Sequence, residues 1–302
     1  MTFLVTDEVA MAVAAGRPVV ALETSVIGQG LPYPRNLECV ERMSGAIRAA
    51  GAVPAWTGVI DGAVRVGLDD DELRRFAESG EATKVARRDV PIAVATGALG
   101  ATTVSATIWA AHRVGIRIGA TGGIGGVHPG PRPDVSADLL ELAHTPVLLV
   151  CSGPKSIVDP AATAEKLEEL GVALVGYGVD RLPFFLARET SVELEHRVDT
   201  PAEAAALARA QLATGSQAAI LLCNPVPPAR ALEADELIEA THRAEARMEA
   251  EGVAGKAVTP FLLAALAEET RGRSLEANLD LLEDNARLAA EVAVALSAAR
   301  SG

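Results

Sequence analysis

Short apolar runs alternate with amphipathic segments along almost the whole chain. Apolar runs of this length are typical of buried strands, and apolar residues spaced three or four apart are typical of helices that cover a sheet. The predicted strands cover residues 18–24, 91–96, 116–121, 146–153, 173–177 and 218–224, with a hairpin inside 53–68. The predicted helices cover residues 36–51, 69–80, 103–115, 136–144, 163–171, 201–215 and most of the chain after residue 232, including 274–299.

This order of elements predicts the fold class. Strands that alternate with helices form a mainly parallel sheet with helices on both faces. The turn Asp61-Gly62 predicts the hairpin and therefore one antiparallel pair. We expect an α/β fold: a three-layer α/β/α sandwich with a largely parallel, mixed sheet and a helical C-terminal section. Since no linker, repeat or low-complexity segment interrupts the pattern, residues 1–302 are expected to form a single catalytic domain.

Polar or glycine-rich residues follow most of the predicted strands. In open α/β sheets, ligands bind outside the carboxyl ends of the strands, so these residues mark where a site is expected. They are Glu23-Thr24-Ser25, Thr96-Gly97, Thr121–Gly126, Ser152–Lys155 and Asn224-Pro225. We expect them to meet at one edge of the sheet.

Composition narrows the possible partners. The 302 residues are 49% hydrophobic but only 3% aromatic, so the core is expected to consist of Ala, Val, Leu and Ile. A net charge of −13 argues against binding a nucleic acid polymer, but it leaves room for a local basic pocket that holds one phosphate. The sequence shows no signal peptide and no membrane span. Its three widely spaced cysteines fit reduced core residues, so we expect a cytoplasmic protein.

The stretch GATGGIGGVHPG, residues 119–130, is unusually rich in glycine. Glycine contributes no side chain to a core, so such a run suggests that a ligand comes close to the backbone. The stretch does not open a helix directly, and it matches neither the Rossmann fingerprint nor the P-loop. Successive glycine N–H groups suit an anion such as a phosphate. A purely structural turn is the alternative.

Two acidic residues follow this glycine-rich stretch. Asp134 lies before a predicted helix and outside its capping positions, so it is a candidate ligand of Mg²⁺ or Mn²⁺, which bind carboxylate oxygens and keep several waters. Ser136 as N-cap and Asp138 in the first turn would favour the helix without any further function. His128 is either a packed or solvated residue or an acid/base or orienting group.

Lysine is rare in this chain, with four lysines among 27 basic residues. Lys166 lies among glutamates and is expected on a solvated helix face. Lys155 directly follows a buried strand, where its amine could attack a carbonyl carbon or bind a phosphate by charge. Lys84 lies close to a pair of arginines, which favours a phosphate contact.

Glu23 ends an apolar strand. It is either an acceptor that caps a helix or a partly buried acid suited to proton donation. A phosphate-binding loop, a metal-binding carboxylate, a lysine nucleophile and a buried acid together suggest an imine-forming enzyme that acts on a sugar phosphate.

Nine segments of the chain together resemble one known family. They are ALETSVIGQGLPYPRN, TKVARRD, GATTVSAT, ATGGIGGVH, DVSADLLEL, CSGPKSI, NPVP, TPFLL and SLEANLDLLEDNARLAAEVA. In this order, between residues 17 and 298, they are similar to the pseudouridine-5′-phosphate glycosidases. The resemblance implies an α/β/α sandwich, a homotrimer and a divalent metal, typically Mn²⁺. It implies reversible cleavage of the C–C glycosidic bond of pseudouridine 5′-phosphate to uracil and ribose 5-phosphate.

The resemblance also implies roles for individual residues. Lys155 matches the lysine that attacks C1′ and holds the opened ribose as an imine, Glu23 matches the proton donor, and Asp134 matches the metal ligand. The implied substrate contacts are Lys84, Val104, Ser136, Ala137, Asp138, His128 and Asn278, the last two at the ribose and uracil ends. Carbon is a poor leaving group, and an iminium at C1′ would allow uracil C5 to be protonated and expelled.

Three alternatives stay open. The same scaffold could act on another substrate, as in the indigoidine-pathway proteins that resemble this family. A Schiff-base aldolase acting on sugar phosphates would release a carbonyl fragment instead of a base. A non-enzymatic nucleotide sensor would need neither Lys155 as a nucleophile nor Glu23.

Overall fold

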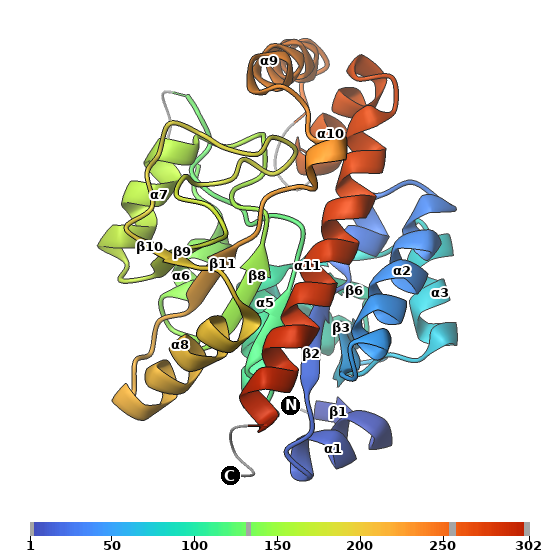
Figure 1. The fold of residues 1–302 in the computed structure, drawn as a ribbon. Coiled ribbons are helices and arrows are strands. Elements are labelled where there is room, and N and C mark those ends of the chain that lie inside the picture. The colour runs from blue at the N-terminus through green and yellow to red at the C-terminus, as the bar shows by residue number, and fades with distance from the viewer. Residues whose placement is uncertain (1–2, 131–133, 254–257, 299–302) are drawn as a thin grey trace.

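The computed structural model describes residues 3–130, 134–253 and 258–298 (Figure 1). The strands are β1 (Phe3–Val5), β2 (Val19–Glu23), β3 (Val53–Ile60), β4 (Ala63–Val66), β5 (Thr83–Val85), β6 (Gly100–Thr102), β7 (Ile118–Ala120), β8 (Leu148–Cys151), β9 (Ala173–Tyr177), β10 (His196–Val198) and β11 (Ile220–Cys223). The α-helices are α1 (Asp7–Ala14), α2 (Arg35–Ala49), α3 (Asp70–Glu78), α4 (Val90–Thr96), α5 (Val104–Arg113), α6 (Ala137–Leu142), α7 (Pro160–Glu169), α8 (Pro201–Thr214), α9 (Ala234–Ala250), α10 (Val258–Glu269) and α11 (Arg273–Ala298). Shorter helical turns are η1 (Val26–Gly30), η2 (Arg87–Asp89) and η3 (Pro228–Arg230).

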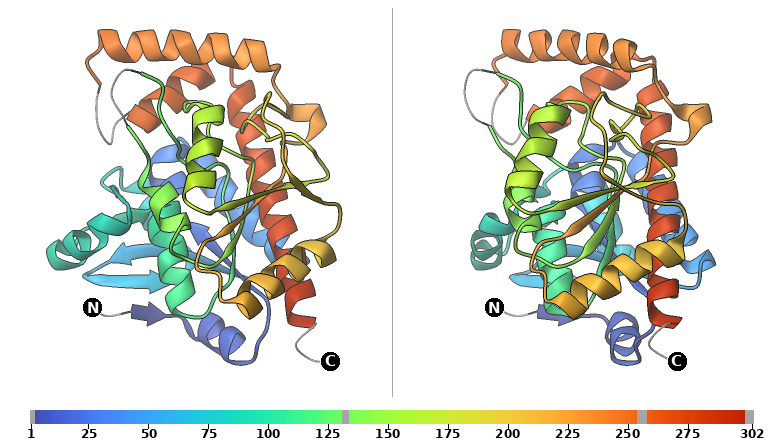
Figure 2. Two further views of the ribbon diagram at one scale, coloured as in Figure 1. Left: turned by 90° about the vertical axis from the view of Figure 1, so that its left-hand side faces the viewer. Right: turned by 60° about the vertical axis from the view of Figure 1, so that its left-hand side comes forward.

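The described strands form one mixed sheet. Its order is β1-β4-β3-β2-β7-β8-β11-β9-β10, and β6 pairs with both β3 and β5. The pairs β3–β4 and β3–β6 are antiparallel, and the others are parallel. Helices cover both faces of this sheet (Figures 1 and 2). The predicted fold class is therefore confirmed, while the assignment of residues 1–302 to one domain stays a prediction.

The side-chain alternation of the central strands explains why both faces are covered. Val20 and Leu22 of β2 pack in a core with α2, α8 and α11. Val19 and Ala21 of the same strand pack on the other face with α1 and α5. Because successive side chains of a strand point to opposite faces, an apolar strand such as β2 must bury both sides.

Two predicted local structures had different outcomes. The hairpin is confirmed, because β3 and β4 pair around Asp61 and Gly62, whose φ angles of 50° and 78° suit a tight hairpin turn. The predicted strand 91–96 is wrong, because these residues lie in helix α4. Pro91 in its first turn and Gly97 as a left-handed C-cap bound this helix. A short apolar run does not distinguish a strand from a short buried helix.

The helices α9 and α10 lie at the end of the molecule opposite β1 and α1 (Figures 1 and 2). Ala244 of α9 and Leu262 of α10 form a small apolar core with Ile157 and Val158, which follow β8. This contact places α10 beside the carboxyl end of the sheet, where a ligand site is expected. None of the helices in the described ranges combines the length and apolar character that crossing a membrane requires.

Candidate active site

A cavity of about 300 Å³ lies where β2, β7 and β8 end. Glu23 and Ser25 follow β2, Gly122 and Gly123 follow β7, and Lys155 follows β8, and all five residues line the cavity. Three of the five predicted strand ends therefore meet here. The fourth, Asn224-Pro225, is not part of the lining, and the fifth, Thr96-Gly97, ends a helix instead of a strand.

Glu23 is the last residue of β2 and is 5% exposed. Its carboxylate accepts hydrogen bonds from two hydroxyls: Thr121 Oγ1 donates to Oε1, and Ser25 Oγ donates to Oε2. A buried polar group needs such partners, and here hydroxyls, not a cation, supply them. Glu23 is therefore a buried carboxylate held in one orientation at the wall of the cavity, as a proton donor would need to be.

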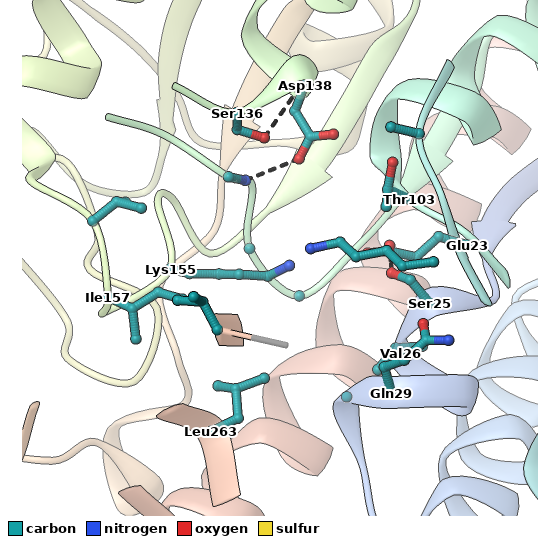
Figure 3. A pocket seen from close by; sticks show the side chains of 18 of the residues that line it. Glu23, Ser25, Val26, Gln29, Thr103, Ser136, Asp138, Lys155, Ile157 and Leu263 are labelled. Carbon is teal, nitrogen blue, oxygen red and sulfur yellow. Dashed lines mark hydrogen bonds between the residues drawn. The ribbon is translucent and has the colours of Figure 1, made fainter. Parts of the chain in front are cut away.

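Lys155 leaves the end of β8 through a short turn that is fixed to the glycine-rich stretch. The Lys155 amide donates to the carbonyl of Ile124 at 3.0 Å, and the Ile124 amide donates to the carbonyl of Gly153 at 3.1 Å. The side chain extends from its own wall of the cavity toward Glu23 and Ser25 (Figure 3). Within the described ranges its ammonium makes no hydrogen bond or ion pair with the protein, so it is available to a ligand in the cavity that it lines.

The glycine-rich stretch is shaped mainly by close packing. A Cβ atom on Gly123 would lie 2.8 Å from Phe185 Cδ2, and one on Gly126 would lie 2.3 Å from Thr163 Oγ1. Five backbone amides of the stretch already donate to the protein, those of Thr121, Ile124, Gly125, Val127 and His128. The amides of Gly122 and Gly123 have no such acceptor in the described chain. The Gly126 amide has no such acceptor there either, but Gly126 is not part of the cavity lining, so Gly122 and Gly123 supply the two such amides that border the cavity.

Asp138 has a structural role in this loop. It is 6% exposed, its Oδ1 accepts from the Ser105 amide and its Oδ2 accepts from the Gly125 amide, each at 3.0 Å. Ser136 caps α6, and its hydroxyl accepts from the Asp138 amide at 3.2 Å. Ser136, Ala137 and Asp138 all line the cavity, and their role as substrate contacts stays a prediction.

A basic cluster borders the same cavity. Burial lowers the pKa of His128, and the positive charges of Lys84 and Lys155 lower it further, against the opposing effect of Asp134. His128 is also fixed by its backbone, since its amide donates to the carbonyl of Asp134 at 2.8 Å. Lys84, Arg88 and Lys155 bring positive charge to a cavity that four carboxylates also line, so in a chain of net charge −13 the cavity offers both cationic and anionic groups to a ligand.

Val104 and Asn278 differ in their placement. Val104 is 2% exposed and packs in the core with Ile108 and Leu139, so its side chain is no substrate contact; its neighbour Thr103 lines the cavity. Only the backbone of Val104, at the start of α5, stays a predicted contact. Asn278 of α11 lines the cavity, and its side-chain amide makes no hydrogen bond within the described ranges.

The sequence indicates no role for Gln29 and Phe185, which also line the cavity, and it indicates Ser25 only as one of the polar residues at the end of a strand. Phe185 lies in the irregular stretch after β9, has a φ of 54°, and packs against Gly122 and Gly123. A left-handed conformation is rare for a bulky residue and marks a place where packing imposes the backbone geometry. Ser25 carried a signal, because a hydroxyl two residues after a strand-ending glutamate can reach its carboxylate.

The donor set near Asp134 fits a hydrated divalent ion. No three His, Cys, Asp or Glu side chains in the described part of the chain form a group that could enclose a metal. Both oxygens of Asp138 are occupied by backbone amides. Asp134 is exposed, lines the cavity and makes no side-chain hydrogen bond in the described ranges. One carboxylate with water and ligand oxygens is an arrangement that Mg²⁺ and Mn²⁺ accept.

A lysine amine that faces a buried glutamate in a cavity lined by both basic and acidic side chains, at the carboxyl ends of parallel strands, defines an α/β enzyme for a small polar substrate. Comparison with known proteins narrows this class. The model of the indigoidine synthase A like family matches residues 8–295, and the chain belongs to that family. The predicted resemblance is thereby confirmed.

Individual relatives cover nearly the whole chain. The chain is 48% identical to the pseudouridine-5′-phosphate glycosidase of Methylobacterium nodulans, over 97% of this chain and 88% of the relative. It is 47% identical to the protein of the same name from Symbiobacterium thermophilum, over 98% of both chains. Its structure is similar to the crystal structure of the prealnumycin C-glycosynthase AlnA in complex with ribulose 5-phosphate, with a TM-score of 0.89 and 39% identity over 100% of this chain and 99% of that one.

Proposed function

We propose that this chain is a pseudouridine-5′-phosphate glycosidase, which reversibly cleaves the C–C glycosidic bond of pseudouridine 5′-phosphate to uracil and ribose 5-phosphate. The relatives that bear this name match the chain at nearly half of all positions and over almost its full length. The observation in this chain that carries the proposal is the Lys155 side chain, which has no ion-pair partner among the described residues and points across the cavity toward Glu23.

Binding of the substrate follows from the charges of the cavity. Lys84 and His128 would hold the 5′-phosphate together with the amides of Gly122 and Gly123, because cations and unpaired N–H groups both favour an anion. The amide of Asn278 offers a donor and an acceptor to the polar edge of uracil. Apolar side chains such as Val26 and Leu263 line the same cavity and would contact the base.

Lys155 would act as the nucleophile. Its neutral amine nitrogen forms a bond to C1′ as the C1′–O4′ bond breaks, and O4′ takes the proton that the nitrogen loses, so the ribose opens. The C1′–C5 bond then breaks as uracil C5 gains a proton from the Glu23 acid. The electrons of the broken bond stay with the ring, and the lysine nitrogen shares its lone pair with C1′ to give the imine. Water then hydrolyses the imine and releases ribose 5-phosphate, so the amine is regenerated.

Asp134 would supply the protein ligand for a divalent metal, for which we propose Mn²⁺. When bound, such an ion would offset the negative charge of the substrate and orient its oxygens. The protein contributes a single carboxylate there, so water and substrate oxygens would complete the coordination. A homotrimer and a cytoplasmic location are proposed on the family resemblance alone.

The test is a trapping experiment. Purified protein is mixed with Mn²⁺ and pseudouridine 5′-phosphate, uracil is measured, and borohydride is added to reduce any imine before peptide mass mapping. We expect uracil and a ribose phosphate adduct on Lys155, and we expect K155A to lose both. Uracil without any adduct would contradict the imine, and a folded protein that yields neither would contradict the activity.

The same experiment separates the alternatives. An aldolase would release a carbonyl fragment and no uracil, and a sensor would bind the nucleotide without turnover. The similarity to a C-glycosynthase supports a second candidate function for this chain, in which the same fold joins a different base to the sugar phosphate. In that case ribose 5-phosphate would still be trapped on Lys155, although pseudouridine 5′-phosphate would not be cleaved.

A further inference from the structure

The Glu23 carboxylate touches two hydroxyl groups, of which one borders the cavity. Thr121 Oγ1 donates to one carboxylate oxygen and Ser25 Oγ donates to the other. Thr121 is 1% exposed and is not part of the cavity lining. Ser25 is half-buried and lines the cavity, facing the side from which Lys155 extends (Figure 3). The Ser25 hydroxyl therefore borders both the carboxylate and the space that a ligand would fill.

The protonation state of Glu23 determines which way its hydrogen bonds to the Ser25 and Thr121 hydroxyls run. Both oxygens of Glu23 lie within hydrogen-bond distance of a hydroxyl, and a hydroxyl can either donate or accept. Once Glu23 is protonated, its carboxyl hydrogen needs an acceptor. One of the two hydroxyls must then rotate so that its oxygen accepts this hydrogen bond instead of donating one. The Ser25 hydroxyl has no second partner in the described ranges, so its hydrogen can turn toward the cavity while its oxygen accepts from Glu23.

We infer that Ser25 is a catalytic residue of the proposed reaction, on which this inference rests: its hydroxyl carries the proton from Glu23 to uracil C5. The Ser25 O–H bond breaks as the C5–H bond forms, and the Glu23 carboxyl hydrogen moves to Ser25 Oγ. The C1′–C5 bond then breaks, its electrons return to the ring, and Lys155 and C1′ form the imine. The net change is one proton moved from Glu23 to the base, and the serine hydroxyl is restored.

A purely structural serine predicts a different result. If Ser25 only held Glu23 in place, it would be equivalent to Thr121, which donates to the other oxygen of the same carboxylate. Loss of either hydroxyl would then have similar effects. Thr121→Val is therefore the matched control for Ser25→Ala, because each variant removes one hydroxyl from Glu23.

The experiment compares two half-reactions in the wild type, S25A, S25T and T121V. The first is uracil release from pseudouridine 5′-phosphate, which requires protonation of C5. The second is borohydride trapping of ribose 5-phosphate on Lys155, which requires an intact site and no protonation of a base. The solvent isotope effect on uracil release is measured in mixtures of H₂O and D₂O, which count the protons in flight.

We expect S25A to lower kcat for uracil release by roughly 100-fold, the lower end of the range for general acid catalysis. Trapping by S25A should stay within about threefold of the wild type, because imine formation does not use this proton. S25T should recover most of the activity, and T121V should lose clearly less than S25A. The proton inventory should be curved for the wild type and linear for S25A.

Four results would count against the relay. Equal losses in S25A and T121V with the same isotope pattern would reduce Ser25 to a positioning residue, and so would a linear inventory in the wild type. Uracil release by S25A at the wild-type rate would overturn the relay while leaving the proposed function intact. No uracil release by a folded wild type would overturn the proposed function and this inference with it.

Discussion

Asn285 donates a hydrogen bond from its side-chain amide to the backbone carbonyl of Thr121 over 2.9 Å. The same nitrogen lies 3.0 Å from Ser152 Oγ, and the side-chain oxygen accepts from Asn224 at 3.0 Å. One fully buried residue of α11 therefore contacts the carboxyl ends of β7, β8 and β11. Since the Thr121 hydroxyl holds Glu23 and Ser152 precedes the turn to Lys155, Asn285 supports both sides of the cavity.

Replacing Asn285 with alanine should destabilise the fold. The substitution leaves the Thr121 carbonyl and the Asn224 amide without this partner in a site that water does not reach, and we expect a loss of roughly 2–4 kcal/mol in the free energy of unfolding. Urea unfolding at pH 7 measures it. Gln211→Leu is the control, because Gln211 is a buried amide with one hydrogen bond far from the cavity. A loss no greater than that of the control would show that the contacts of Asn285 contribute little.

The central sheet was predictable because its strands follow a simple rule. A strand buried on both faces, such as β2 or β8, is a continuous apolar run, and helices must separate parallel strands. The rule failed at α4, where a run of similar composition is a helix, and at the three-residue strands β5 and β6, which are too short to show a period. The local sequence pattern determines the secondary structure of long elements, whereas tertiary contacts determine that of these short ones.

The candidate site was predictable to the extent that it follows the strands. Glu23 and Lys155 each come directly after a buried strand, so topology alone brings them to one edge of the sheet. Phe185 and Asn285 come from an irregular stretch and a distant helix, and no local pattern indicates that they reach the site. The number of glycines predicted a phosphate-binding backbone, which stays a prediction, whereas the structure shows that most of them allow close packing of side chains such as Ser136.

Gly125 should not tolerate a side chain. A Cβ atom there would lie 2.2 Å from Ser136 Oγ and 2.6 Å from Ser136 Cβ, so the N-terminus of α6 would have to move. Gly125→Ala is expected to lower the free energy of unfolding by about 1–3 kcal/mol, as overpacking usually does, and to weaken binding of ribose 5-phosphate. Calorimetric titration and thermal unfolding measure the two effects.

Gly45→Ala provides the comparison for this variant. Gly45 lies in α2, and an added Cβ would have no neighbour within 4 Å. Alanine is favoured over glycine inside a helix by about 1 kcal/mol, so this variant should be as stable as the wild type or more so. If Gly125→Ala behaved like Gly45→Ala in both measurements, the close contact with Ser136 would be without consequence.

Asp280 should make stability depend on pH. Burial alone would raise the pKa of this carboxyl, but hydrogen bonds from Arg42 and Arg230 outweigh burial and hold the pKa below its ordinary value of 3.8. The carboxyl therefore contributes stability that is fully present above pH 3.8 and is lost as the pH falls through the lowered pKa. Asp280→Asn should lower the free energy of unfolding at pH 7 by about 1 kcal/mol.

The pH dependence distinguishes this ion pair from a general effect of charge. Urea unfolding of the wild type and Asp280→Asn should show a gap at pH 7 and pH 5 that narrows below pH 3.8. Asp71→Asn is the control, because the Asp71 side chain is 95% exposed and its nearest guanidinium nitrogen, on Arg74, is 3.9 Å away. A gap that stayed constant down to low pH would mean that the lost stability does not come from the charge of Asp280.

Asp134→Asn tests the metal site through binding as well as activity. The amide keeps the size of the side chain but removes the negative charge, and Asp134 is the only carboxylate we assign to the ion in the described ranges. We expect Mn²⁺ affinity in the presence of ribose 5-phosphate to fall by roughly tenfold or more, because hard divalent ions depend on charged oxygens. Water-proton relaxation measures bound Mn²⁺ without any turnover.

Glu165→Gln, which neutralises an exposed acid on α7 outside the cavity lining, should bind Mn²⁺ like the wild type. Equal Mn²⁺ binding by the wild type and both variants would place the ion away from Asp134, and the carboxylate would then act only through its charge beside His128.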